Sequence, residues 1–166
     1  MSAYLNTFIQ INDGDEYIDM PSYSRNNPLF QVLSPMVPYE KLTEADIPLL
    51  EIAIKNMKEG IDSLETGKKN AETLYNAISS YNNSIEEKIE EQNNIREEIN
   101  EYEDDIKLHT NQLSFLYFLK DMLEGQEYKH SKACNIKIWM GIEACPEHWY
   151  EEDIGTEKTE IKQDEN

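Results

Sequence analysis

A long stretch of the chain, from Thr43 to Leu123, has apolar residues at every third or fourth position and mostly charged or amide residues between them. This spacing places the apolar side chains along one side of a helix. The stretch covers about half of the 166 residues. One or two unusually long amphipathic helices are therefore predicted, and the fold must provide a surface that covers their apolar side.

The first helix is predicted to begin after an N-cap at Thr43 or Asp46, with Pro48 tolerated close to its start. Gly60 and Gly67 each weaken a helix by about 1 kcal/mol relative to alanine. The helix is therefore expected to pack against another helix, which would compensate for this weakness. Its apolar stripe comprises Leu50, Ile54, Met57, Ile61, Leu64, Ala71, Tyr75 and Ile78, with Lys68 as its one charged member.

A break between two helices is predicted at 81–87, because Asn82 and Asn83 suit a turn and Ser84 with Glu87 has the sequence of a capping box. The second helix is predicted to end near Gly125, which would act as its C-cap. Two helices joined by a tight turn form an antiparallel hairpin, placed at residues 43–125. The alternative is one continuous helix that pairs between two chains. The second apolar stripe comprises Ile85, Ile89, Ile95, Ile99, Tyr102, Ile106, Leu113, Leu116 and Leu123.

Both ends of the chain predict β-strands. Aromatic and β-branched residues are frequent in 4–11 and 16–20, and Asp13-Gly14 between these runs is a strong signal for a β-hairpin within residues 1–20. Four prolines punctuate the following segment, so residues 21–42 are predicted to be a loop region with at most one short helical turn over 29–33. Residues 134–143 are predicted to form a further strand that pairs with the N-terminal hairpin.

These elements predict an α+β fold, in which a long antiparallel helical (coiled-coil) hairpin projects from a small antiparallel β-sheet formed by the N- and C-terminal segments. The run Leu113–Leu119 is apolar on nearly all sides, so it is predicted to be buried where the hairpin meets the sheet. Residues 1–150 are expected to form a single domain. Residues 151–166 are acidic and poor in large apolar residues, which predicts a disordered tail.

Charge is the strongest compositional constraint on function. The chain has 34 acidic and 15 basic residues, a formal net charge of -19. This excess argues against direct binding to nucleic acid or to an anionic membrane and favours a protein partner with a basic surface. No signal peptide, membrane-spanning run or lipidation motif is evident, so a cytoplasmic protein with reduced thiols is expected.

One set of side chains has the composition of a zinc site. His130 and Cys134 lie close together in the sequence, as do Cys145 and His148, and together they would supply a Cys2His2 set. The spacing matches no known zinc finger, because the intervening residues have the pattern of a strand. The favoured alternative is structural cysteines with two surface histidines, and no cofactor is predicted.

A dense run of carboxylates on the second helix is the main candidate for binding a partner. Carboxylates three or four residues apart on a helix stand about 5–6 Å from each other. Successive phosphates of a DNA strand have comparable spacing, so the run could imitate nucleic-acid charge. The alternative is a solvated outer face without a specific role. We name these residues the arm carboxylates: Glu86, Glu87, Glu90, Glu91, Glu97, Glu98, Glu101, Asp104 and Asp105.

Catalytic signatures are absent from the sequence. It has no glycine-rich phosphate-binding loop, no nucleophile elbow and no HExxH motif. Pairs of acidic residues are so frequent that they do not indicate acid–base catalysis. A non-enzymatic protein is therefore expected.

Four short segments, Tyr4–Ile9, Ser22–Arg25, Tyr81–Ser84 and Gly141–Glu143, resemble segments of short proteins carried by bacteriophages and prophages of low-GC bacteria. The resemblance implies an accessory protein that binds a host or defence component, in the host cytoplasm if phage-encoded. Small acidic inhibitors of nucleic-acid-handling machines recur among such proteins. The leading hypothesis is therefore an acidic interaction protein of this inhibitor type. The alternative is a structural or assembly protein that oligomerises through its helical seam, for example as a homodimer.

Overall fold

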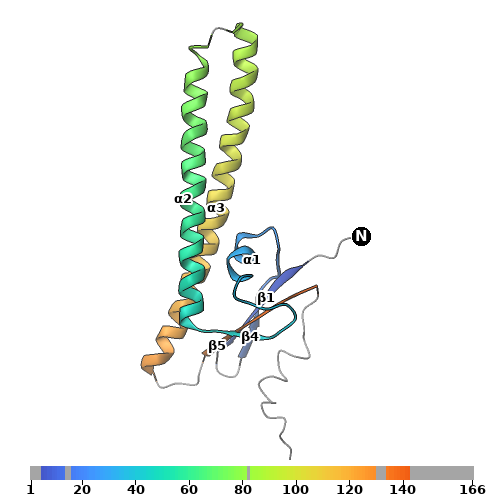
Figure 1. The fold of residues 1–166 in the computed structure, drawn as a ribbon. Helices are drawn as coiled ribbons and strands as arrows, with labels where there is room; N and C mark the ends of the chain where they lie inside the picture. The colour runs from blue at the N-terminus through green and yellow to red at the C-terminus, as the bar shows by residue number, and fades with distance from the viewer. Residues whose placement is uncertain (1–4, 14–15, 82, 130–133, 143–166) are drawn as a thin grey trace, which may run out of the picture. The chain divides into compact units, whose positions relative to one another are not determined.

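The computed structural model describes residues 5–13, 16–81, 83–129 and 134–142 (Figure 1). In chain order its elements are β1 (Asn6–Asp13), β2 (Glu16–Asp19), β3 (Tyr23–Ser24), α1 (Pro28–Leu33), β4 (Thr43–Ala45), α2 (Ile47–Ile78), α3 (Ile85–Lys129) and β5 (Cys134–Gly141). The chain divides into two compact units. We call the described part of Met1–Ala53 and Leu116–Asn166 the sheet unit, and Ile54–Phe115 the hairpin unit.

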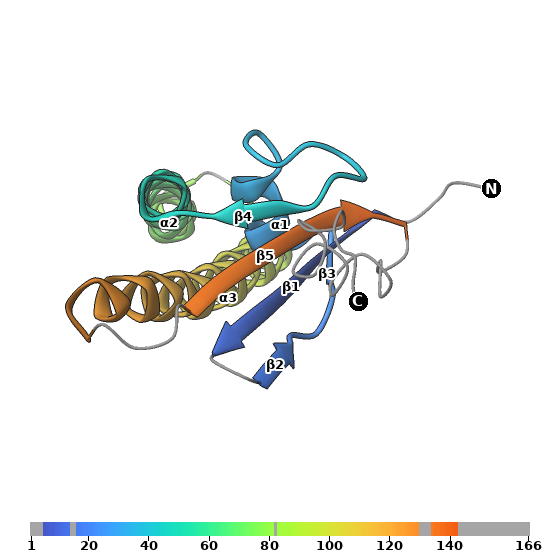
Figure 2. The ribbon, with the colours of Figure 1, turned by 90° about the horizontal axis from the view of Figure 1, so that it is seen from below.

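The sheet unit contains a five-stranded antiparallel sheet built from both ends of the chain. Its strand order is β2-β1-β5-β4, and β3 also pairs with β1 (Figure 2). β1 and β2 form the predicted hairpin, in which Asp13 lies opposite Glu16. β5 pairs with β1 along its whole length, from Asn6 opposite Gly141 to Asp13 opposite Cys134. The predicted α+β class, with a sheet of N- and C-terminal segments and a helical hairpin, is confirmed.

One face of β1 and β5 supplies the core of this sheet. Ile9 lies opposite Ile138 and Ile11 opposite Ile136, and none of these four side chains is more than 2% exposed. Side chains of paired residues in an antiparallel sheet share a face, so these isoleucines form one apolar layer. Other fully buried side chains of the sheet unit are Leu29, Leu33, Leu50, Leu116, Leu119 and Met140.

The segment between the first hairpin and α2 has more structure than predicted. The helical turn at 29–33 is confirmed as α1, whose N-cap Asn27 accepts a 2.8 Å hydrogen bond from the Leu29 amide. Two short strands, β3 and β4, were not predicted. The expectation that the helical region starts at residue 43 is wrong, because Thr43 pairs with Ile138 in the sheet. Asp46 is the N-cap instead, accepting a 2.9 Å hydrogen bond from the amide of Leu49.

The predicted turn between the two long helices is confirmed, since α2 ends at Ile78 and α3 begins at Ile85. Ser84 and Glu87 form both halves of the capping box. The Glu87 amide donates to the Ser84 hydroxyl at 3.2 Å, and the Ser84 amide donates to the Glu87 carboxylate at 3.3 Å. The local sequence therefore fixes where α3 starts.

Two glycines of α2 lie where the helices of the hairpin unit approach each other. A Cβ atom on Gly60 would lie 3.4 Å from the His109 ring, and a Cβ atom on Gly67 would lie 2.7 Å from the Tyr102 ring. The pairs are offset by seven residues in opposite directions along the two helices, which is an antiparallel heptad register. The glycines therefore provide space for rings of α3 in the seam.

Two predictions about the last part of α3 are wrong. Gly125 does not end the helix, which continues to Lys129. The run Leu113–Leu119 is not buried on all sides, because Tyr117 is 36% and Phe118 52% exposed while only Leu116 and Leu119 are fully buried. A seven-residue run is nearly two helical turns, so some of its side chains must point away from the core.

Lys120 links the two long helices inside the sheet unit. Its Nζ lies 3.6 Å from a carboxylate oxygen of Glu51 on α2 and 3.4 Å from one of Glu124 on α3. The hydrogen bond to Glu124, together with the negative charges of both carboxylates, raises the pKa of Lys120 above its usual range. The two carboxylates therefore favour the charged form of the Lys120 ammonium group.

Substitution Gly125→Ala is expected to raise the free energy of unfolding by about 0.4–1 kcal/mol, because alanine favours a helix interior over glycine. A Cβ atom at this position would have no neighbour within 4 Å. Urea unfolding followed by circular dichroism measures the change. A loss of stability would instead support the C-cap role predicted from the sequence, since alanine is disfavoured at a left-handed cap.

Candidate functional site

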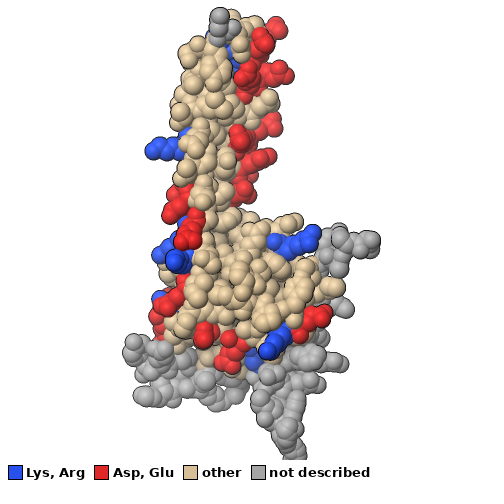
Figure 3. Space-filling view, viewed as in Figure 1, with Lys and Arg blue, Asp and Glu red and all other residues tan. Residues whose placement is uncertain are grey.

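The arm carboxylates all lie on α3 within the hairpin unit, and all are exposed except the half-buried Glu91. Figure 3 shows acidic side chains gathered along the α3 side of the hairpin. Helical spacing divides them between two neighbouring faces. The first face carries Glu86, Glu90, Glu97, Glu101 and Asp104, and the second carries Glu87, Glu91, Glu98 and Asp105.

Two arm carboxylates have structural roles near the turn. Glu87 belongs to the capping box, and Glu91 accepts a 3.0 Å hydrogen bond from the Asn83 side chain. Within the described residues, the other arm carboxylates form no ion pair within 4.0 Å. Their charges are therefore available to a cationic surface from outside the chain.

A shallow cavity of about 230 Å³ lies where the two acidic faces meet. Its lining comprises Glu98, Glu101, Tyr102 and Asp105. The Tyr102 ring is half-buried, because one side of it lies against Gly67 of α2. An aromatic ring surrounded by carboxylates is a favourable environment for a lysine or arginine side chain. The cavity therefore favours a cationic side chain, as do the two acidic faces around it.

A third face of α3 carries none of the arm carboxylates. Ile85, Ile89 and Arg96 share this face, because they are separated by four and seven residues. Ile85 is 76% exposed and Ile89 is 53% exposed. The arm carboxylates are therefore confined to two faces of α3, whereas the third face exposes apolar side chains, Arg96 and Glu103, which pairs with Lys68 of α2.

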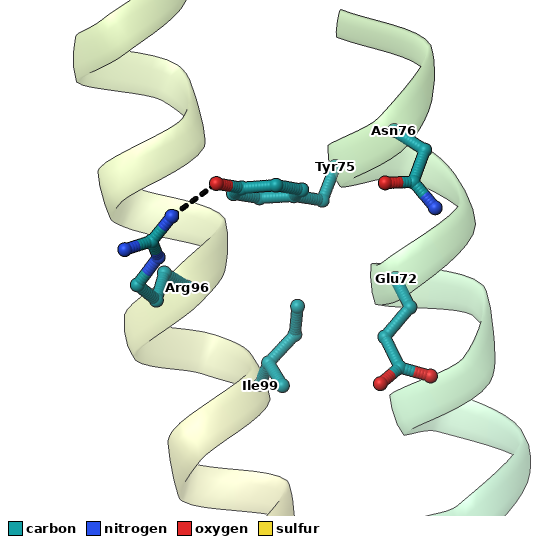
Figure 4. A pocket seen from close by; sticks show the side chains of 5 residues that line it. All are labelled: Glu72, Tyr75, Asn76, Arg96 and Ile99. Atoms are coloured by element: carbon teal, nitrogen blue, oxygen red, sulfur yellow. Dashed lines mark hydrogen bonds between the residues drawn. The ribbon is translucent and has the colours of Figure 1, made fainter.

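A cavity lies beside this third face, in the groove between α2 and α3 (Figure 4). It measures about 420 Å³ and is lined by Glu72, Tyr75 and Asn76 of α2 and by Arg96 and Ile99 of α3. We call it the tyrosine–arginine groove. The Tyr75 side chain reaches across toward α3, and Nη2 of Arg96 donates a hydrogen bond to its hydroxyl oxygen. The guanidinium carbon lies 5.3 Å from the centre of the Tyr75 ring, close enough for a cation–π interaction.

Sequence reasoning missed the tyrosine–arginine groove. It assigned Tyr75 to the apolar stripe and gave Arg96 no role. The available signal was the pairing of the helices: once the turn is placed at residues 82 and 83, Tyr75 and Arg96 fall near each other on opposite helices. Sequence periodicity alone does not show that the ring and the guanidinium leave a cavity beside them.

The predicted metal site stays a prediction. Cys134 is a buried residue at the start of β5, whereas His130, Cys145 and His148 lie outside the described residues. In the described ranges, no group of three or more histidine, cysteine, aspartate or glutamate residues is arranged to hold a metal ion.

Polar side chains line the face of the sheet opposite the isoleucine layer. Gln10 is fully buried and donates a 2.9 Å hydrogen bond to Asp19 on β2. The side-chain oxygens of Gln10, Asn12 and Asn135 have no hydrogen-bond partner among the described residues. Buried acceptors are normally satisfied. These three acceptors are therefore exceptions to this rule among the described residues.

No protein-family model, curated protein or solved structure matches this chain. In the described part of the chain, no helix combines the length and the apolar character needed to cross a membrane.

Proposed function

We propose that the protein is a non-enzymatic interaction protein that binds a basic surface of another protein through the two acidic faces of α3. The observation that carries this proposal is the unpaired state of most arm carboxylates on a regular helix. Carboxylates without intramolecular ion pairs have no such pair to break when they bind the cations of a partner. The high net negative charge also accelerates encounter with a basic surface.

The same arrangement supports a nucleic-acid mimic as the more specific form of this function. A regular row of carboxylates can occupy a groove that normally holds a phosphate backbone, because such a groove recognises charge spacing. The resemblance to phage accessory proteins supports an inhibitor of a nucleic-acid-handling or defence protein. The partner is then expected to bind either this chain or DNA, but not both.

The proposal is tested by neutralising arm carboxylates without changing their shape. The arm variant carries Glu90→Gln, Glu97→Gln, Glu101→Gln and Asp104→Asn. The control variant carries Glu16→Gln, Glu59→Gln, Asp62→Asn and Glu65→Gln, which are exposed carboxylates elsewhere in the chain. Each variant removes four charges, so the formal net charge changes from -19 to -15 in both. A difference in binding between the two variants therefore depends on where the charges were removed and not on how many were removed.

Immobilised wild-type chain and control variant are expected to retain the same protein from a bacterial lysate, and the arm variant about tenfold less of it. Mass spectrometry quantifies the retained protein. Added double-stranded DNA and raised salt are both expected to release it, because both compete with the carboxylates for cations. Equal losses from both variants, or retention that is insensitive to salt, would overturn the proposal.

A further inference from the structure

The tyrosine–arginine groove holds two opposite charges that do not pair with each other. Glu72 on α2 and Arg96 on α3 both line it, yet no ion pair within 4.0 Å joins Arg96 to any described carboxylate. Figure 4 shows the Glu72 carboxylate and the Arg96 guanidinium on opposite sides of the groove. By contrast, Lys68 and Glu103, in the same pair of helices, approach to 3.1 Å.

Tyr75 holds Arg96 in place without neutralising it. The phenol oxygen accepts one hydrogen bond from Arg96, and the guanidinium lies over the ring of Tyr75. Neither the hydroxyl nor the ring carries a charge that would neutralise the guanidinium. A guanidinium group has five N–H donors in a fixed plane, which suits bidentate binding of a carboxylate. Arg96 is therefore preorganised for an anionic group that the described part of its own chain does not provide.

Apolar exposure on the same face indicates that the missing group belongs to a protein. Ile85 and Ile89 are large exposed side chains on the same face of α3, about three and two turns before Arg96. Two helices alone bury only part of their apolar surface, and two paired hairpins can form a four-helix bundle with a shared apolar core. A small anion would leave both isoleucines in water, whereas a second helical hairpin would cover them.

We propose that the tyrosine–arginine groove is a self-association surface, on which a second copy of this chain docks with two-fold symmetry. Such an interface is isologous, so a contact between two different residues occurs twice. Arg96 of one copy then pairs with Glu72 of the other, and the reciprocal pair forms at the same time. Each copy supplies both missing partners, and this charge complementarity selects a second copy as the occupant.

The distribution of charge is compatible with this dimer. The arm carboxylates lie on the other faces of α3, so docking through the third face leaves them exposed on both copies. Long-range repulsion between two chains of formal charge -19 opposes the dimer, and salt screens that repulsion. Dimerisation is therefore expected to strengthen from low to physiological salt, the opposite of binding to a basic partner.

Sedimentation equilibrium of the full chain tests the interface. The wild type is expected to dimerise reversibly at physiological salt. Glu72→Arg and Arg96→Glu are each expected to weaken the dimer by about tenfold or more, because each places like charges in contact. The double variant that exchanges both charges is expected to dimerise within about threefold of wild type, because the pairs are restored in reverse.

Matched controls distinguish loss of the interface from an effect of net charge and from misfolding. Glu97→Arg changes the net charge as Glu72→Arg does, and Lys55→Glu changes it as Arg96→Glu does, but both controls lie outside the groove. Neither control is expected to weaken the dimer, and circular dichroism checks that helix content is kept. A monomeric wild type, or a double variant without recovery, would overturn the proposal. The arm variant is expected to dimerise like the wild type, because its substitutions lie outside the groove. The capture experiment and the sedimentation experiment can therefore fail independently of each other.

Discussion

Substitution Ile138→Ala is expected to lower the free energy of unfolding of the sheet unit by about 2–5 kcal/mol, the usual cost of deleting a buried aliphatic side chain. Ile138 is fully buried. It lies opposite Ile9 on β1 and opposite Thr43 on β4, so its side chain is at the centre of the sheet. Because β1 and β5 come from opposite ends of the chain, a cavity here weakens the contact that joins them.

Urea unfolding measures this change, with far-ultraviolet circular dichroism and tryptophan fluorescence as separate probes. Ile18→Ala is the matched control, because Ile18 lies on the edge strand β2 and is 45% exposed. The control is expected to cost less than about 1 kcal/mol, as for most exposed positions. If Ile138→Ala costs no more than Ile18→Ala, the pairing of β5 between β1 and β4 is wrong.

The features that were predictable from the sequence have a local physical cause. Asp13-Gly14 is a dipeptide that favours a tight β-hairpin, and the paired strands β1 and β2 lie on either side of it in the sequence. Ser84 and Glu87 satisfy amides that a helix start leaves unpaired, and α3 begins at the next residue after Ser84. In both cases the groups that determine the structure are within three residues of each other.

The features that were missed depend on distant residues. Strands β3 and β4 have two and three residues, too few to show an alternating pattern, and exist because β1 and β5 offer them free edges. Gly125 carries the sequence signal of a helix end, but the helix continues through it. A glycine signals a possible cap, and the residues around it decide whether the cap forms.

The two candidate surfaces differ in the same way. The acidic faces of α3 follow from composition and helical spacing, so their residues were predictable. The tyrosine–arginine groove requires residues of two helices in a particular register, with Tyr75 and Arg96 brought together across 21 positions of the chain. An unpaired charge becomes visible only when the neighbours of Arg96 are known. Sequence alone could therefore indicate the acidic surface but not the groove.

Substitution Gly67→Ala is expected to destabilise the hairpin unit by about 1–3 kcal/mol, although alanine is the better helix former. An added Cβ atom would lie 2.7 Å from Cε1 and Cζ of Tyr102, well inside van der Waals contact. The Tyr102 ring would have to shift away from α2, or the helices would have to separate. Urea unfolding followed by the helical circular dichroism signal measures the loss.

Gly60→Ala is the matched control, since this glycine occupies the equivalent seam position one heptad earlier. Its added Cβ atom would lie 3.4 Å from the His109 ring, an ordinary contact. The control is therefore expected to stabilise the hairpin by up to about 1 kcal/mol through helix propensity alone. Opposite signs at two glycines of one helix would show that the ring beside Gly67, and not a general property of glycine, decides the outcome.

A double-mutant cycle with Tyr102→Ala tests the cause directly. Tyr102→Ala alone is expected to be destabilising, because it removes a half-buried ring from the seam. Once the ring is gone, Gly67→Ala no longer meets it, so the same substitution is expected to stabilise the Tyr102→Ala chain by up to about 1 kcal/mol. The sign of one substitution would thus depend on one side chain of the opposite helix. If Gly67→Ala had the same effect in both backgrounds, Tyr102 would not lie against Gly67, and the heptad register of the hairpin would be wrong.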